Sequence, residues 1–305
     1  MIYDIIGDIH GQADKLTGLL TKLGYHHNGQ FWQAPPNHQA IFLGDFIDRG
    51  DKQLATLAIV FKMIDNGQAL AVMGNHEYNA IAYATEYQNA YCRTHSDRNQ
   101  KQHQAFLDAV GFGSDLHAHW IERFYELPLW LDLPDFGVVH ACWHKQAMMT
   151  LKPHLTNCRL NPQTFADLYH TPDIRKALNQ LLNGLEVIVP EPQYLIDGQG
   201  IKRNNMRIAW WQDCLDKPLL QISAASNCDV SHINADLYVK IDFEFAEQKP
   251  IFIGHYWLKE TPALLGKQVI CTDYSAGTTG FLTAYQFDSD NPTLSNHNFV
   301  QYYHQ

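Results

Sequence analysis

Three apolar runs near the N-terminus each end in a block of glycine and polar residues: IYDIIGDIHG (2–11), AIFLGDFIDRG (40–50) and ALAVMGNHE (69–77). Stretches with apolar residues at helical spacing separate these runs. Strands that alternate with helices in this way favour parallel pairing with right-handed crossovers. We therefore expect three buried strands, with helices at 16–23 and 51–65 between them. Asp51 is the predicted N-cap of the second helix, and Gly24 the predicted end of the first.

The three polar blocks are predicted to lie together, because ligand sites in α/β sheets form outside the carboxyl ends of the strands. Their carboxylate, imidazole and amide groups suit divalent metals. Their glycines let the backbone turn sharply and approach a ligand closely. One such block by itself is more often a solvated turn or a helix cap. Three blocks at three successive strand ends indicate a common site.

The composition describes a folded protein with an acidic surface. The chain has 305 residues, 46% of them hydrophobic and 18% charged, with a net charge of −10. This balance excludes a disordered chain and disfavours nucleic acid or anionic lipid as a partner. No basic leader and no apolar run of about 18 residues are present, so we expect neither secretion nor a membrane span. Six cysteines without a Cys-x-x-Cys pair are typical of reduced thiols in a cytoplasmic protein.

The remaining sequence gives a coarser prediction. A β-hairpin is expected over 129–141, helices over 116–125 and 163–183, and either a loop or a helix over 91–104. Further strands are expected at 237–243, 251–253, 269–272 and 281–287. No repeat or clear linker divides the chain. The simplest organisation is one domain over 1–305, with an elaborated insertion or cap at about 145–235.

The series Gly-Asp-x-His-Gly, Gly-Asp-x-x-Asp-Arg-Gly and Gly-Asn-His-Glu resembles the calcineurin-like binuclear metallophosphoesterases. It is most similar to their phosphoprotein phosphatase branch, which includes bacterial and phage protein phosphatases and symmetrical diadenosine tetraphosphatases. The resemblance covers residues 1–80 closely. It implies a four-layer αββα sandwich, in which two mixed β-sheets are flanked by helices. Trp257 stands where other branches carry an additional histidine ligand, and this departure favours the phosphatase branch.

The resemblance also implies a site for two divalent metal ions. It needs two more histidines after strands, and His140 and His255 fit that requirement. Asp8 and His10 would hold the first ion, and Asp45 would bridge both. Asn75, His140 and His255 would complete the second. Mn²⁺ is the metal expected to support activity in vitro, with Fe or Zn as alternatives in the cell.

The implied mechanism is attack on phosphorus by a hydroxide that bridges the two metals. His76 would be the general acid, Asp48 would orient its ring, and Arg49 would bind phosphate oxygens. A packed, purely structural imidazole is the alternative for His76. Glu77 is interpreted as a helix-start residue and not as a base.

Weaker signals suggest substrate contacts. Arg203 and Arg207 are candidates for a second phosphate-binding arginine, with a solvated basic edge as the alternative. His144, Tyr256 and Tyr274 are further candidates because each lies near a proposed ligand or where related phosphatases carry a tyrosine.

The function predicted from the sequence is hydrolysis of phosphomonoesters, either in a phosphoprotein or in a small phosphate ester. The alternative is a symmetrical dinucleoside polyphosphate hydrolase of the diadenosine tetraphosphatase kind. A catalytically inactive binding module of the same fold is disfavoured, because degenerate members lose ligands and here every implied ligand is present. The oligomeric state does not follow from the sequence.

Overall fold

The computed structural model describes residues 1–197, 200–225 and 228–303. Its central sheet carries the N-terminal strands. The strand order is β16 (Asp273–Tyr274), β17 (Phe281–Asp288), β1 (Ile2–Ile6), β4 (His38–Phe42) and β5 (Ala69–Ala71), with β18 (Phe299–Tyr302) paired to β17. β1, β4 and β5 are parallel, whereas β17 runs antiparallel to β1. The predicted parallel start of the chain is confirmed.

The second sheet contains the strands that precede the two later histidines. Its order is β15 (Val269–Cys271), β14 (Ile251–Ile253), β9 (Gly137–Val139) and β8 (Trp130–Asp132). β14 is parallel to both β15 and β9, and β8 and β9 form the predicted antiparallel hairpin.

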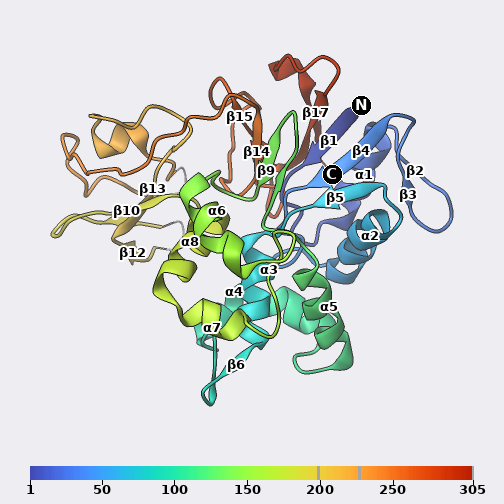
Figure 1. The fold of residues 1–305 in the computed structure, drawn as a ribbon, viewed down its shortest axis with the longest axis horizontal. Coiled ribbons are helices and arrows are strands. Elements are labelled where there is room, and N and C mark those ends of the chain that lie inside the picture. Colours follow the sequence, from blue (N-terminus) through green and yellow to red (C-terminus); the bar gives the residue numbers. More distant parts are fainter. Residues whose placement is uncertain (198–199, 226–227, 304–305) are drawn as a thin grey trace.

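The two sheets pack face to face through one apolar cluster. Ile5 and Ile41 from the first sheet meet Val138 and Phe252 from the second in this cluster, and each is fully buried. Because side chains alternate across a strand, Ile6 and Phe42 point to the opposite face, where they join the helices in the larger cluster. Two mixed sheets flanked by helices are thus confirmed (Figure 1).

Eight helices of the described residues surround the two sheets (Figure 1). They are α1 (Ala13–Lys22), α2 (Gln53–Asp65), α3 (Asn75–Ala84), α4 (Asp97–Val110), α5 (Asp115–Tyr125), α6 (Lys145–Leu151), α7 (Phe165–His170) and α8 (Pro172–Asn183). α1 and α2 contact the first sheet. α8 meets the loop after β9, where Ala141 N donates to Leu181 O at 2.9 Å. None of these helices combines the length and apolar character needed to cross a bilayer.

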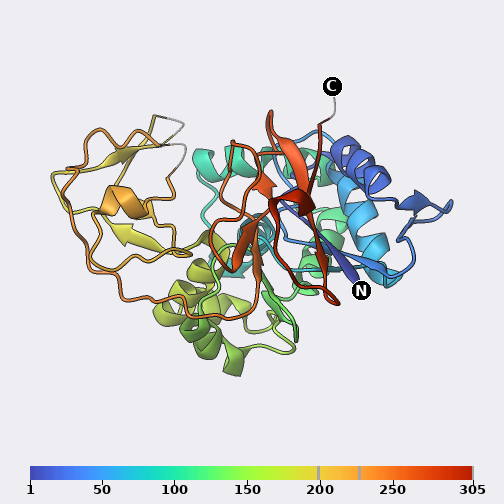
Figure 2. The same ribbon diagram turned by 90° about the horizontal axis from the view of Figure 1, so that it is seen from above.

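Short strands and extended chain after α8 form a lobe beside the sandwich, drawn in yellow and orange in Figure 2. Its paired strands are β10 (Glu186–Ile188) with β13 (Asn205–Arg207), and β11 (Leu195–Ile196) with β12 (Lys202–Arg203). Two small hairpins lie elsewhere: β2 (His26–His27) with β3 (Trp32–Gln33), and β6 (Glu86–Tyr87) with β7 (Ala90–Tyr91).

Three local predictions are corrected. Asp51 does not cap α2, because the helix begins at Gln53 and its N-cap residue is Lys52. The segment 163–183 is two helices, because Pro172 begins α8 and cannot continue α7. The segment 237–243 is not a strand. Its side chains do alternate between half-buried and exposed, but no strand among the described residues pairs with it. The segment 91–104, for which a loop and a helix are both expected as alternatives, leads into helix α4.

Candidate metal centre

All three polar blocks and both later histidines meet at the carboxyl ends of the strands. Asp45 lies at the centre of this group. Its carboxylate oxygens are 3.6 Å from His10 Nε2, 3.8 Å from His76 Nε2 and 3.4 Å from His140 Nε2. Two clusters of metal-binding groups share it, one with His10 and His76 and the other with His140 and His255. A carboxylate in this position has an oxygen for each of two ions.

Asn75 and Asp8 complete the group. Asn75 Oδ1 lies 2.8 Å from His255 Nδ1 and 3.0 Å from His140 Nε2. The carboxylate of Asp8 accepts the backbone N–H of His255 at 3.2 Å. The structure therefore brings together in one buried cluster the six residues predicted as ligands, namely Asp8, His10, Asp45, Asn75, His140 and His255.

Backbone carbonyls orient two of the rings. His10 Nδ1 lies 2.8 Å from Ile47 O, and His140 Nδ1 lies 2.6 Å from Leu43 O. Each ring thus donates its Nδ1 proton to a carbonyl and directs Nε2 towards Asp45. Hydrogen bonds of this kind fix the tautomer that a metal-binding histidine needs.

The protonation states of the site residues and the imidazole nitrogens that lack a described hydrogen-bond partner fit a divalent metal. Within residues 1–197, 200–225 and 228–303, the buried Nε2 atoms of His10 and His255 have no hydrogen-bond partner. Burial lowers the pKa of both rings well below the usual range, which keeps them neutral and able to bind a metal. Burial opposes ionisation of Asp45, but His140 and His76 outweigh it and hold the Asp45 pKa well below its usual value. The Asp45 charge in turn overcomes burial and raises the pKa of His140 to about 10. A metal there must displace a proton.

His76 and Asp48 form a close pair beside the cluster. His76 Nδ1 is 2.5 Å from Asp48 Oδ2, so Nε2 faces Asp45. Burial disfavours the imidazolium, yet the charges of Asp45 and Asp48 outweigh it and raise the His76 pKa. Burial also opposes ionisation of Asp48, and the rings of His103 and His76 overcome it and lower the Asp48 pKa. A proton on His76 is therefore stabilised beside the site.

Arg49 follows Asp48 in an exposed position. Its guanidinium lies 3.4 Å from the centroid of the Trp257 ring, an intimate cation–π contact. The departure noted at Trp257 therefore has a structural consequence, because the indole supports the predicted phosphate-binding side chain.

The backbone is strained where it carries the site. Asp45, Asp48, Arg49 and His255 all have positive φ, between 53° and 72°. Such conformations cost about 1–3 kcal/mol each and persist only where the surroundings impose them.

Glu77 is one source of that constraint. Its buried carboxylate accepts the backbone N–H groups of Asp45 and Phe46, each at 2.8 Å, and of Gly74 at 3.0 Å. Burial and the nearby Asp45 charge raise the Glu77 pKa to about 7. Glu77 lies in the first turn of α3, at the helix start as predicted, and its carboxylate also connects the second polar block to the third.

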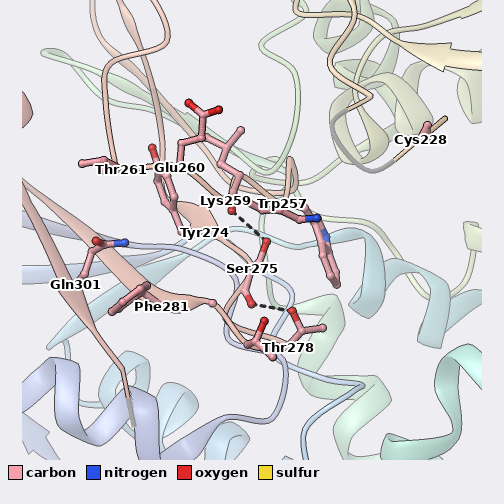
Figure 3. Close-up of a pocket in the computed structure, with 13 residues that line it drawn as sticks. Cys228, Trp257, Lys259, Glu260, Thr261, Tyr274, Ser275, Thr278, Phe281 and Gln301 are labelled. Carbon is pink, nitrogen blue, oxygen red and sulfur yellow. Dashed lines mark hydrogen bonds between the residues drawn. The ribbon is translucent and has the colours of Figure 1, made fainter. Parts of the chain in front are cut away.

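The weaker candidates for substrate contact differ in how close they lie to the proposed ligands. Tyr256 lies directly beyond His255 and its hydroxyl accepts Trp210 Nε1–H at 2.9 Å, and Arg207 acts electrostatically on His255. His144 instead caps α6, and Arg203 is paired with Asp197 at 2.7 Å. The hydroxyl of Tyr274 accepts the N–H of Ala263 at 3.1 Å. Tyr274 and Trp257 both line a cavity of about 1130 Å³ (Figure 3).

Sequence reasoning did not find Lys15, a buried lysine that holds the loop 275–280 against the site. Its Nζ donates to the carbonyls of Ala276 and Gly280 at 2.7 and 2.9 Å. A Cβ built on Gly277 in this loop would lie 2.7 Å from His10 Cδ2. The loop thus forms one wall of the metal centre.

Replacing Lys15 by methionine is expected to lower the free energy of unfolding by about 1–3 kcal/mol, because it leaves the buried carbonyl of Ala276 unsatisfied and one such acceptor costs roughly that amount. Urea unfolding measures this loss. Lys22→Met on the same helix is the matched control, because Lys22 donates to Gln301 O at an exposed position. Equal stability of the two variants would contradict the anchoring role.

The family model of calcineurin-like phosphoesterases matches residues 1–189, which carry most of the cluster. The chain therefore belongs to the calcineurin-like phosphoesterase family, a class of metal-dependent phosphoester hydrolases.

The chain is similar to several named proteins of known or assigned type. The bis(5'-nucleosyl)-tetraphosphatase PrpE [asymmetrical] of Oceanobacillus iheyensis is 30% identical over 141 residues, covering 46% of this chain and 55% of the relative. The same-named protein of Halalkalibacterium halodurans is 40% identical over 76 residues, covering 25% and 31%. The chain thus matches only about half, or less, of these relatives' lengths. A protein serine/threonine phosphatase from Saccharomyces cerevisiae shares the fold, with a TM-score of 0.51, 14% identity and coverage of 100% and 80%.

Proposed function

We propose that this protein hydrolyses phosphomonoesters, in a phosphoprotein or in a small phosphate ester. The observation that carries the proposal is the His76–Asp48 pair, which directs His76 Nε2 towards the cluster centred on Asp45. A proton donor next to a metal site is the arrangement that cleavage of an unactivated phosphate ester requires.

Two divalent ions would be held as the sequence predicts. Asp8 and His10 would hold one ion, Asn75, His140 and His255 would hold the other, and Asp45 would contribute to both. Bound divalent ions supply Lewis-acid charge and lower the pKa of water, so that a nucleophile exists at neutral pH. We propose Mn²⁺ as the ion that supports activity in vitro, with Fe or Zn as alternatives.

The chain's own groups would handle the leaving oxygen and the phosphate. As the P–O bond breaks, its electron pair stays on the leaving oxygen, which takes the proton from His76 Nε2. Asp48 holds the opposite ring nitrogen, so the donating nitrogen stays directed into the site. Arg49 binds phosphate oxygens with its planar fork, and the Trp257 ring keeps that fork in place.

A second candidate is hydrolysis of dinucleoside polyphosphates, which the names of the relatives favour. One pocket also supports it. Arg98, Arg203 and Arg207 line a cavity of about 380 Å³ next to Trp257, together with Glu186 and Asp197. Guanidinium groups recognise phosphate oxygens well. The relatives are described as asymmetrical, whereas the alternative predicted from the sequence is symmetrical, so the products decide between the two.

Product analysis with the Mn²⁺-loaded protein tests both candidates. The substrates are p-nitrophenyl phosphate, phosphoserine and phosphotyrosine peptides, and diadenosine tetraphosphate. Release of inorganic phosphate from monoesters, with the dinucleotide intact, is expected for the first candidate. Formation of ADP indicates symmetrical cleavage, and formation of ATP with AMP indicates asymmetrical cleavage. No turnover of any substrate would favour the inactive binding module.

The variant Arg98→Gln tests whether the arginine-lined cavity binds the dinucleotide. If the dinucleotide is the substrate, its KM is expected to rise at least about tenfold, since a hydrogen bond to a charged group contributes roughly 1.5–3 kcal/mol. Arg159→Gln, an exposed arginine outside the pocket, is the matched control. An unchanged KM in Arg98→Gln would remove the pocket from dinucleotide binding.

We further propose that the chain is one domain and that the region 145–235 is its cap, because the arginine pocket combines residues of that region with Trp257 at the site. All six cysteines carry free thiols, which supports action in the cytoplasm.

A further inference from the structure

We infer that His103 is a positioning residue, which fixes the Asp48 carboxylate and through it the proton-donating ring of His76. This inference rests on the proposed function, because it concerns the acid in that reaction. His103 belongs to α4, outside every motif that the sequence analysis singled out.

The contact is direct and buried. His103 Nδ1 lies 2.9 Å from Asp48 Oδ1, while His76 Nδ1 lies 2.5 Å from Asp48 Oδ2. Each carboxylate oxygen therefore has its own imidazole. Asp48 is 2% exposed and His103 5% exposed, so water is a poor substitute for either ring. Two separate partners prevent the carboxylate from rotating about its Cβ–Cγ bond.

The proton on His103 has one favourable place. Its Nε2 is buried and has no hydrogen-bond partner among the residues that the structure describes. A proton on that nitrogen would be a buried donor without an acceptor, which is costly. The proton therefore lies on Nδ1 and is donated to Asp48. The Asp48 charge is stabilised by two donors, and it remains available to hold the Nδ1–H of His76.

Aromatic packing holds the His103 ring itself. Phe106 stacks on it, with ring centroids 5.1 Å apart, and Tyr83 meets it edge-on at 5.5 Å. This packing fixes the angle from which Nδ1 approaches Asp48. Without the hydrogen bond, Asp48 Oδ1 would be a buried acceptor with no donor, and the carboxylate would gain by turning away from His76.

A core-filling role is the competing explanation, and His117 provides the comparison. It is also a buried histidine, 4% exposed, and its ring lies near the same Phe106 at 6.1 Å. Its Nδ1, however, accepts the backbone N–H of Gly113 at 3.3 Å, and no carboxylate in the described part of the chain is paired with it. Loss of a buried imidazole is thus common to His103 and His117 variants, whereas loss of a donor to Asp48 is specific to His103.

The test is steady-state kinetics of the full chain with Mn²⁺, using a good leaving group (p-nitrophenyl phosphate) and a poor one (an alkyl phosphate). For His103→Leu, kcat for the alkyl ester is expected to fall about 10–100-fold, the usual effect of losing an outer hydrogen-bond partner. Turnover of p-nitrophenyl phosphate is expected to fall much less, because p-nitrophenolate needs little help from an acid. KM and metal content are expected to stay unchanged.

Three further variants separate positioning from packing. His103→Asn is expected to restore most of the alkyl ester rate, because its amide nitrogen can take the place of Nδ1. His103→Gln, whose amide reaches the position of Nε2, is expected to stay impaired, and this pair remains informative if His103→Leu does not fold. His117→Leu is expected to keep the wild-type ratio of the two rates.

Equal losses for the two substrates would overturn the inference, and so would equal effects of the His103 and His117 variants or failure of asparagine to rescue. These outcomes leave the proposed function intact, because wild-type turnover establishes it separately. A wild-type protein that hydrolyses no phosphate ester would overturn both.

Discussion

Replacing Asp45 by asparagine is expected to remove metal binding and turnover together. Asp45 stands between His10, His76 and His140, and it is the one residue shared by both clusters of metal-binding groups. The amide is neutral, and its nitrogen would point a donor at a ring or an ion. Removing one partner of a buried charged group costs about 3–5 kcal/mol. At about 1.4 kcal/mol for each factor of ten, metal affinity is expected to fall about 10²–10⁴-fold.

The measurement is metal content after dialysis, together with kcat on p-nitrophenyl phosphate. Asp65→Asn is the matched control, because Asp65 is an exposed carboxylate paired with Arg123 at 2.6 Å. That variant is expected to keep both metal and activity. If Asp45→Asn held two equivalents of metal and turned over normally, the shared role of Asp45 would be wrong.

Strand-end position explains why the metal cluster could be predicted from sequence. Asp8, Asp45 and Asn75 each follow a strand of one parallel set, and parallel strands end at the same edge of their sheet. His140 and His255 follow β9 and β14, which are parallel to each other in the facing sheet. Short apolar runs, glycine turns and polar residues thus carry enough information to bring these side chains together. Their roles as metal ligands stay a prediction.

Contacts made by helices could not be read in the same way. His103 lies on a polar stretch for which the sequence left loop and helix equally open, and no spacing rule connects it to Asp48. Lys15 lies within a predicted helix, but its carbonyl partners are more than 260 residues away along the chain. Such contacts depend on tertiary packing, which a local pattern does not contain.

The strand predicted at 237–243 is wrong for a different reason: here the local pattern is present, but pairing with a described strand is not. Alternation of apolar and polar residues predicts an extended chain with one face buried, and Leu237, Val239 and Ile241 do lie against the core. A strand also needs a neighbour to complete its hydrogen bonds. The sequence of this segment carries no information about that neighbour.

Replacing His76 by asparagine is expected to leave the metals bound and to slow esters with poor leaving groups most. His76 is half-buried, Asp48 holds its Nδ1, and its Nε2 is the ring atom that faces the cluster. Removing a general acid typically costs about 10²–10⁴-fold in rate, and the loss is largest where the leaving oxygen is most basic. An alkyl phosphate is therefore expected to lose far more than p-nitrophenyl phosphate.

Parallel rates for the two esters, with metal content measured on the same samples, decide whether His76 is an acid or a packed imidazole. His38→Asn is the matched control, because His38 also contacts an aspartate, Asp4, at 2.9 Å, but at the opposite end of β4. Its variant is expected to keep the wild-type ratio of the two rates. An equal slowing of both esters by His76→Asn would mean that His76 does not donate the proton. A loss of metal would instead assign His76 to the ligand set with His10 and Asp45, where its Nε2 lies 3.8 Å from the shared carboxylate.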